Sequence, residues 1–426
     1  MTRSPIHATR VLRSAWTSQA LRAAVALTLG GGAFALGDLA LARVLPKEEY
    51  GRFSLALAIV MIGILTGPLG AQVIVNRHPT DAGPRLLGRT VWTSALVGLA
   101  LALGAGALYP LDPPLLAAMV CAITAGGSNL VVVGHYQSRQ RYGLSLLLSA
   151  SSSLSLLTAG ITSVIFRPTT ALVPAALFAV CLWVSPAIGW WKAFRERVGL
   201  EPADQPFRWG EGLAAVGTIG AAMVLGTIER LVIPRALSLP DLATFSVLST
   251  LAGSPFQALN QGVGFALLPS LRGAQHAAER RRVLEHELLV VVAGCAISAV
   301  IVSWAIPIVL RYVLVGRYVL QGGLIMAAIA VGALKPLGAV AVATVNAVGS
   351  AGDLAWLGGI AWAACLLGFG GAWLGVRWGL TGLVYGVGIG WLLRAGASGW
   401  LASRSLQRAE TANRRRQGLV GALAEE

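Results

Sequence analysis

The feature that most constrains this chain is the recurrence of long apolar runs separated by short charged or turn-rich connections. Twelve such runs lie near residues 20–44, 51–75, 89–109, 113–135, 142–166, 169–191, 212–236, 242–271, 287–310, 318–349, 353–376 and 378–403. An α-helix needs roughly 20 apolar residues to cross a bilayer, and each run is about that long or longer. The runs are continuous rather than alternating, which favours helices over the strands of a barrel. The sequence therefore predicts an all-α polytopic membrane protein with twelve transmembrane helices.

The supply of charged residues agrees with this prediction. Of the 426 residues, 12% are charged and 56% are hydrophobic, whereas an ordinary soluble domain has about 25% charged residues. So few charges cannot cover a water-facing surface, and the apolar content excludes a disordered chain. Only about 35 residues are available for each span and its connection, so no sizeable soluble domain is expected.

The distribution of basic residues predicts an orientation. The formal net charge is +15, and 22 of the 33 Lys and Arg residues lie in alternate connections and at the two termini. The other set of connections holds nine, and the last two basic residues, Lys335 and Arg394, lie inside spans. Basic residues are concentrated on the cytoplasmic side of membrane proteins. We therefore expect both termini in the cytoplasm, and the basic excess requires no nucleic-acid partner.

Several features that point to other classes of protein have simpler explanations. The basic N-terminus before the apolar stretch 23–36 resembles a signal peptide, but eleven further spans follow, so we expect a retained first span. The four cysteines lie in apolar runs without the spacing of metal ligands, which predicts inert thiols. The chain has no Ser/His/Asp, metal-ligand or Walker-type arrangement, so we expect no enzyme activity, no metal and no cofactor.

A midpoint connection divides the chain into two similar parts. The longest connection, 192–211, contains Pro202 and Pro206 and separates an N-terminal half (1–191) from a C-terminal half (212–403), which a basic tail (404–426) follows. A shift of 192 residues places Arg43 on Arg235, Glu49 on Asp241, Phe53 on Phe245 and Ser54 on Ser246. These matches predict two six-helix halves related by a parallel repeat, an arrangement found in transporters.

The junction between the first two spans carries a family resemblance. It reads Leu39-Ala40-Leu41-Ala42-Arg43-Val44-Leu45-Pro46-Lys47-Glu48-Glu49-Tyr50-Gly51-Arg52-Phe53-Ser54. Its Arg-x-Leu, acidic turn and Tyr-Gly-x-Phe-Ser resemble the same junction in bacterial polysaccharide exporters, the O-antigen and teichuronic-acid type of lipid-linked oligosaccharide flippase. The second half is similar in Glu229-Arg230-Leu231, Thr244-Phe245-Ser246 and Leu267-Leu268-Pro269-Ser270, but Leu242-Ala243 replaces the Tyr-Gly.

The resemblance implies a function and its partners. Polysaccharide exporters belong to the multidrug/oligosaccharidyl-lipid/polysaccharide exporter superfamily, which also includes multidrug exporters and the lipid II flippase. A member of this kind would flip or export undecaprenyl-diphosphate-linked oligosaccharide or polysaccharide precursors across the bacterial plasma membrane by alternating access. Its partners would be that lipid-linked substrate, membrane lipids and a coupling ion. The alternatives are a cation-coupled multidrug exporter and, less favoured, a membrane-embedded glycan polymerase or glycosyltransferase.

Two basic residues inside spans are the first candidates for a substrate site. Lys335 lies in the middle of a charge-free run between Tyr318 and Gly352 and precedes Pro336, and Arg394 lies in the last span. A charge at the bilayer centre costs about 2.5–3.5 kcal/mol, so such residues usually face a cavity or a partner. Arg binds phosphate groups bidentately and Lys acts as a point charge. Lys335 and Arg394 therefore suit a diphosphate headgroup, although each could instead neutralise an acid or bind backbone carbonyls opened by proline.

Polar side chains inside other spans suit a sugar chain. Gln72, Asn129 and Asn260 are the candidates, because an oligosaccharide needs a wet surface with hydrogen-bonding groups. The alternative is structural, since Asn and Gln in membrane spans commonly form hydrogen bonds between helices.

The remaining charged candidates lie close to span ends. Arg230 and Arg22 could add to the substrate site, although Arg22 also suits the cytoplasmic boundary of the first span. Asp38 and Glu229 could couple transport to an ion or form a structural ion pair with Arg230. The sequence leaves these alternatives open.

Overall fold

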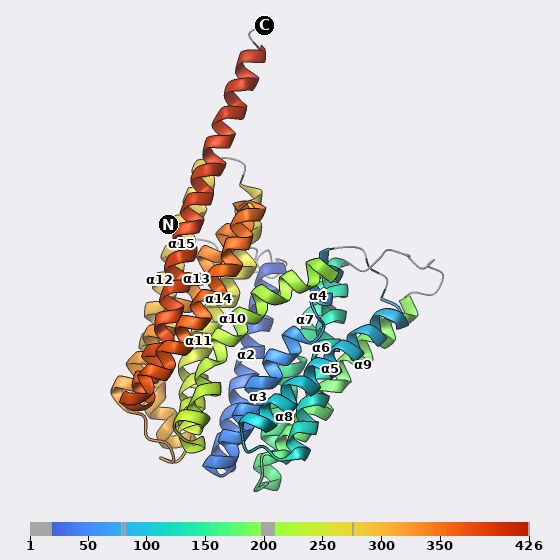
Figure 1. The fold of residues 1–426 in the computed structure, drawn as a ribbon, viewed down its shortest axis with the longest axis vertical. Helices are drawn as coiled ribbons and strands as arrows, with labels where there is room; N and C mark the ends of the chain where they lie inside the picture. Colours follow the sequence, from blue (N-terminus) through green and yellow to red (C-terminus); the bar gives the residue numbers. More distant parts are fainter. Residues whose placement is uncertain (1–18, 78–79, 81, 197–208, 275–276, 425–426) are drawn as a thin grey trace, which may run out of the picture. The chain divides into compact units, whose positions relative to one another are not determined.

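The computed structural model describes residues 19–77, 80, 82–196, 209–274 and 277–424, and every regular element in this part of the chain is helical. The α-helices are α2 (Gln19–Val44), α3 (Lys47–Thr66), α4 (Ala71–Arg77), α5 (Pro84–Leu108), α6 (Pro113–Ser138), α7 (Tyr142–Ser149), α8 (Ser151–Phe166), α9 (Leu172–Glu196), α10 (Trp209–Ala236), α11 (Leu239–Gly273), α12 (Ala277–Ile308), α13 (Gly322–Val348), α14 (Ala351–Gly375) and α15 (Gly379–Ala424) (Figure 1). A π-helical turn, η1 (Val309–Val313), follows α12, and a 3-10 turn, η2 (Val376–Trp378), precedes α15.

Each of the twelve predicted spans has a helical counterpart, although two helices form the second span (α3, α4) and two form the fifth (α7, α8). Within the described residues, nine helical stretches are long and apolar enough to cross a membrane. One of these stretches, Gly352–Ala409, contains both α14 and most of α15. The protein is an all-α polytopic membrane protein, as the sequence predicts.

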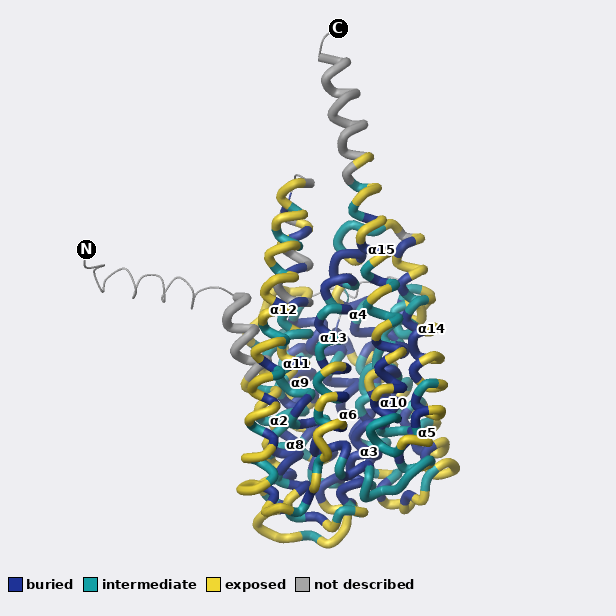
Figure 2. Tube along the Cα trace, turned by 90° about the vertical axis from the view of Figure 1, so that its left-hand side faces the viewer, coloured by how far each residue is buried: buried dark blue, intermediate teal, exposed yellow. Residues whose placement is uncertain are grey.

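Some helices are largely buried, whereas others expose much of their apolar surface. In the most apolar windows of α3 and α6, 67% of residues are buried, but only 22% are buried in the stretch Ala278–Val313. Figure 2 shows much of α12 as exposed. Exposed leucine, valine and tryptophan side chains are stable against lipid, and for this reason a spanning helix needs no polar face.

By packing, the chain forms two compact units that differ from the predicted halves. The first comprises Met1–Thr250 and Ile308–Val319, and the second comprises Leu251–Pro307 and Leu320–Glu426. The division therefore falls within α11, whereas the predicted halves follow the internal repeat. Most of the predicted connection 192–211 lies outside the described residues, and the segment predicted as a basic tail continues α15 as far as Ala424.

The second span is broken within the first unit. Pro68 has no backbone N–H to continue the ladder, and α3 ends at Thr66. Leu69 and Gly70 then take positive φ angles of 50° and 81°, and α4 begins at Ala71. The break packs closely on α10, because a Cβ added to Gly212 would lie 2.7 Å from the carbonyl oxygen of Leu69. A non-glycine residue at 212 would therefore force these backbones apart.

Another deviation precedes α13. The sequence predicts a span from residue 318, but residues 318–321 are not helical and α13 begins at Gly322. Val315 and Gly316 turn the chain with φ angles of 52° and 68°. This places Ile308–Val319 in the first unit although α12 and α13 belong to the second. Pro336 lies inside α13, which stays helical through it.

In the second unit, α14 packs directly on α15 through glycine pairs. Cβ atoms added to Gly371 and Gly386 would collide with each other's backbones, so only glycine allows this approach. The start of α14 is fixed by a capping box between Ser350 and Asp353. Arg408 of α15 donates to Asp353 at 3.0 Å, which joins the beginning of α14 to the far part of α15.

Candidate functional site

A buried polar cluster surrounds Asp38 in the first unit. Asp38 is 2% exposed, and its Oδ2 accepts hydrogen bonds from Tyr50 Oη at 2.9 Å and from Thr250 Oγ1. Arg230 of α10 is close enough to act electrostatically on this carboxylate. Glu229, the preceding residue, is also buried. The structure thus brings the sequence candidates Asp38 and Arg230 together, and it adds two hydroxyl groups that the sequence analysis missed.

Two residues that the 192-residue shift of the sequence places on each other, Ser54 and Ser246, are in contact. The Oγ atoms of Ser54 and Ser246 lie 2.5 Å apart, and both side chains are buried. Only residues close to a two-fold axis can touch their own equivalents, so this contact is what a parallel repeat predicts. The axis would pass between α3 and the first part of α11.

The connection between α5 and α6 binds the end of α10. Tyr109 Oη donates to the carbonyl oxygen of Leu231 at 2.7 Å. In the opposite direction, Arg235 Nη1 donates to the carbonyl oxygen of Leu108, the last residue of α5, at 3.1 Å. The carbonyl group of Leu108, as the last residue of α5, lacks an intrahelical donor, so Arg235 satisfies a group that a membrane cannot.

The connection before α13 binds the end of α2 in a similar way. Tyr318 Oη donates to the carbonyl oxygen of Ala42 at 3.0 Å, and Arg317 Nη1 donates to that of Arg43 at 2.9 Å. Burial raises the pKa of Tyr318, which precedes the membrane-spanning part of α13, to about 12. The phenol therefore remains a donor at physiological pH. We call these two sets of contacts the tyrosine contacts. In each of them, the connection between the third and fourth spans of one predicted half binds the first span of the other predicted half.

A cationic cluster lies in the second unit, where Lys335 of α13 and Arg394 of α15 meet on one aromatic ring. Lys335 Nζ lies 5.2 Å and the Arg394 guanidinium carbon 5.4 Å from the ring centroid of Trp391. Both distances are within the range of cation–π attraction. The structure therefore brings the two deepest basic residues together. Sequence reasoning missed Trp391, whose spacing of three residues from Arg394 on one helix is the signal that could have found it.

Two hydrogen-bond donors of this cluster, Trp391 and Arg394, have no acceptor among the described residues. The indole N–H of Trp391 is buried and has no hydrogen-bond partner among the described residues. Arg394 forms no hydrogen bond or ion pair with any residue in the described part of the chain. Buried polar groups in native proteins are nearly always paired, so an arrangement of unpaired donors beside two positive charges suits an anion.

The amide of Asn129 joins three segments of the first unit. Its Nδ2 donates to the carbonyl oxygen of Leu148 at 3.0 Å and to Ser151 Oγ at 3.1 Å. Its Oδ1 accepts a hydrogen bond from Ser185 Oγ at 2.8 Å. These bonds connect α6 with the α7–α8 span and with α9, which is the interhelical alternative that the sequence left open.

The other candidates are more dispersed. Gln72 is 9% exposed. Its Nε2 donates to the carbonyl oxygen of Leu65 at 3.3 Å, across the break in the second span. Its Oε1 is buried and has no hydrogen-bond partner among the described residues. Asn260 is part-exposed on α11. Arg22 belongs to α2, but its side chain lies outside the described part of the structure.

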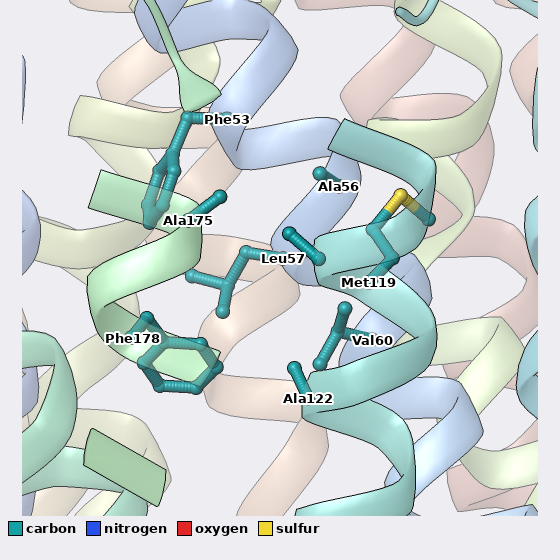
Figure 3. Close-up of a pocket in the computed structure, with 9 residues that line it drawn as sticks. Phe53, Ala56, Leu57, Val60, Met119, Ala122, Ala175 and Phe178 are labelled. Carbon is teal, nitrogen blue, oxygen red and sulfur yellow. The ribbon is translucent and has the colours of Figure 1, made fainter. Parts of the chain in front are cut away.

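A small cavity lies in the first unit, and none of the sequence candidates lines it. Its lining residues are Phe53, Ala56, Leu57, Val60, Ala118, Met119, Ala122, Ala175 and Phe178 (Figure 3). Ligand pockets usually include a few polar groups as well as apolar ones. The residues that line this cavity are all apolar, so it does not suit an oligosaccharide. In the part of the chain that the structure describes, no cluster of three or more His, Cys, Asp or Glu residues could hold a metal ion.

Solved structures of transporters resemble this protein along nearly its whole length. The lipid II flippase MurJ, in an inward closed conformation, aligns with a TM-score of 0.66 and 10% identity over 92% of this chain and 90% of its own. An inward-facing multidrug resistance MATE family transporter of the MOP superfamily aligns with a TM-score of 0.64 and 12% identity over 92% of this chain and 99% of its own. This chain has the fold of these transporters.

A third structure, an outward-facing MATE family transporter, aligns with a TM-score of 0.57 and 12% identity over 93% of this chain and 98% of its own. No protein-family model matches the sequence, and no curated protein sequence matches it either. The fold of the superfamily that the sequence resembles is thus confirmed, while the low identities limit the likeness to the fold.

Proposed function

We propose that this protein is an alternating-access transporter that flips or exports lipid-diphosphate-linked oligosaccharide or polysaccharide precursors across the bacterial plasma membrane. The observation that carries the proposal is the meeting of Lys335 and Arg394 on Trp391 within membrane-spanning helices. A diphosphate brings at least two negative charges and several acceptor oxygens. It therefore matches the charge and the donors of this cluster.

The other sequence candidates have assigned parts in this proposal. Arg230 and Arg22 would assist in attracting the headgroup, and Gln72 and Asn260 would contact the sugars. Asn129, the third polar candidate, would instead hold helices together through its existing hydrogen bonds. The fold shared with a lipid II flippase supports a lipid-linked substrate. Undecaprenyl diphosphate is the carrier that the sequence resemblance implies.

A cation-coupled multidrug exporter is the second candidate, and the Asp38 cluster favours it. A buried carboxylate that accepts hydrogen bonds from Tyr50 and Thr250 and interacts electrostatically with Arg230 could exchange a proton or a cation during transport. The fold shared with multidrug MATE transporters supports such coupling. Organic cations, however, would favour acidic residues at the binding site, whereas the cluster at Trp391 is basic. The same Asp38 cluster could also couple the flipping of a lipid-linked substrate.

A reconstituted flipping assay tests the leading proposal. Vesicles would contain the protein and candidate undecaprenyl-diphosphate-linked oligosaccharides, and the measured quantity is the rate at which these lipids reach the opposite leaflet. The double variant Lys335→Ala, Arg394→Ala should lower the rate at least tenfold. Arg281→Ala, which removes a charge on an exposed side chain that pairs with Glu285, should leave it unchanged.

Two results would contradict the proposal. Normal flipping by the double variant would exclude the cluster as the headgroup site. Absence of flipping by the unaltered protein, together with export of organic cations that Asp38→Asn abolishes, would favour the multidrug exporter.

A further inference from the structure

We propose that Trp391 is itself a substrate-binding residue whose indole N–H donates a hydrogen bond to a diphosphate oxygen. The inference rests on the proposed function for the lipid-linked source of that diphosphate. It goes further by assigning to the headgroup a third donor that neither the charge pattern nor the fold indicates. Lys335 and Arg394 would neutralise the charge while Trp391 recognises the oxygen.

The first observation is the state of the indole N–H. Trp391 is 9% exposed, and its Nε1 is buried with no hydrogen-bond partner in the described structure. A buried tryptophan in a native protein usually finds an acceptor for this group. A ligand that supplies an acceptor during part of the transport cycle explains why the protein itself provides none.

The second observation is that the neighbouring groups are also donors. Arg394 carries five N–H donors, none of which bonds a described residue, and Lys335 carries an ammonium group on the same ring. A site of donors and positive charge excludes cations and selects an anion with many acceptor oxygens. A diphosphate meets this requirement better than a carboxylate, because it offers more oxygens and more charge.

The third observation is that the ring face of Trp391, and not its N–H, interacts with the two cations. The ring face of Trp391 attracts Lys335 and Arg394, which lie 5.2 Å and 5.4 Å from its centroid. The N–H lies on the ring edge and is not needed for this attraction. Phenylalanine would keep an aromatic face for the two cations and remove only the donor.

Access to the N–H requires movement of the side chains around it. Lys335 and Arg394 are both part-exposed, so an anion meets them before it reaches the buried N–H at the ring edge. Pro336, next to Lys335, leaves α13 without one backbone hydrogen bond at this level. A local shift of α13 is therefore less costly here than in an uninterrupted helix.

The experiment measures binding of farnesyl diphosphate, inorganic diphosphate and farnesol to the full-length purified protein by calorimetry. Trp391→Phe should weaken binding of farnesyl diphosphate about tenfold or more, because a hydrogen bond to a charged group is lost. Binding of farnesol, which has no phosphate, should be unchanged. A loss confined to farnesyl diphosphate assigns the site to a lipid headgroup, and an equal loss for inorganic diphosphate assigns it to any diphosphate.

Trp400→Phe is the matched control. Trp400 lies on the same helix, is 61% exposed, and carries Arg404 at 5.4 Å from its ring, so it repeats the cation–π pair at an exposed position. This control should bind diphosphate as the unaltered protein does. Equal affinities in Trp391→Phe and Trp400→Phe would overturn the inference.

Two further measurements keep the result interpretable. If Trp391→Phe does not fold, Arg394→Gln should weaken diphosphate binding without affecting farnesol, and unchanged binding would again overturn the site. A protein that binds diphosphate through Trp391 but flips no lipid-linked oligosaccharide would contradict the proposed function alone. Normal flipping with diphosphate binding that does not depend on Trp391 would contradict this inference alone.

Discussion

The buried amide of Asn129 illustrates how single residues in this protein serve either packing or transport. Its two donor bonds and its acceptor bond all go to neighbouring helices. An amide that is fully engaged in this way can contact a sugar only by giving up a bond. The geometry therefore favours the interhelical alternative for this residue.

Replacing Asn129 with alanine should accordingly lower stability more than transport. Hydrogen bonds between membrane helices contribute about 0.6 kcal/mol each on average and up to about 1.7 kcal/mol, so we expect a loss of about 1–3 kcal/mol. A thermal melt in detergent should show a lower midpoint, while transport per folded molecule stays normal. Asn76→Ala, which removes one exposed contact to Gln137 at 3.4 Å, is the control. An unchanged midpoint with lost transport would instead place Asn129 in the sugar path.

Sequence reasoning at this scale finds charges more readily than aromatic partners. Lys335 stands out because a lone ammonium group in a long apolar run requires an explanation. Trp391 does not stand out, since tryptophan is a common residue in membrane spans. Its importance depends on α13 and α15 lying side by side, and no local pattern in the sequence encodes that contact.

At the scale of helices, the sequence predicts that a spanning helix is present better than it predicts where that helix is broken. Hydropathy places the second span correctly, and Pro68 indicates where its ladder fails. The positive φ angle of Leu69 and the fit of Gly70 against α10 depend on contacts with a helix far along the chain. The late start of α13 also accompanies distant contacts, because Arg317 and Tyr318 before it bind the end of α2.

The contact between Ser54 and Ser246 yields a prediction about movement. Alternating access requires helices of the two halves to separate on one side of the membrane in turn. In a background whose four native cysteines are replaced, a Ser54→Cys, Ser246→Cys pair should form a disulfide under oxidation, because the two Oγ atoms lie 2.5 Å apart. Oxidation should block transport at least tenfold, and a reductant should restore it.

The loss of maleimide labelling would measure disulfide formation in this experiment. Ser54→Cys alone is the control and should keep transport under oxidation. Full transport by the cross-linked protein would mean that α3 and α11 stay together throughout the cycle.

At the scale of the whole molecule, local signals predict the number of passes, but they do not predict how the chain packs into units. Each of the twelve apolar runs has a helical counterpart among the described residues because each run carries its own hydropathy signal. The boundary after Thr250 and the return of Ile308–Val319 to the first unit follow from distant contacts. A repeat in the sequence indicates which residues of the two halves correspond, whereas the compact units depend on which residues pack together.

An even number of passes places both chain ends on one side, and the basic residues predict that this side is the cytoplasm. Green fluorescent protein joined after Glu426 should therefore fluoresce in bacterial cells, and alkaline phosphatase joined there should be inactive. Alkaline phosphatase inserted in the connection between Tyr109 and Asp112 should be active. Activity at the C-terminus would reverse the predicted orientation.

The hydrogen bonds of Tyr109 and Tyr318 have a consequence for the order in which the helices acquire their contacts during synthesis. The end of α2 receives its hydroxyl donor from Tyr318, 276 residues later than Ala42 in the chain, whereas α10 meets Tyr109, which was made 122 residues before Leu231. During synthesis, the carbonyl groups at the end of α2 therefore cannot receive the donors of Arg317 and Tyr318 until those residues have been made. Tyr109, in contrast, is already present when α10 is made. The end of α2 therefore receives these hydrogen bonds only after a much later segment of the chain has been made.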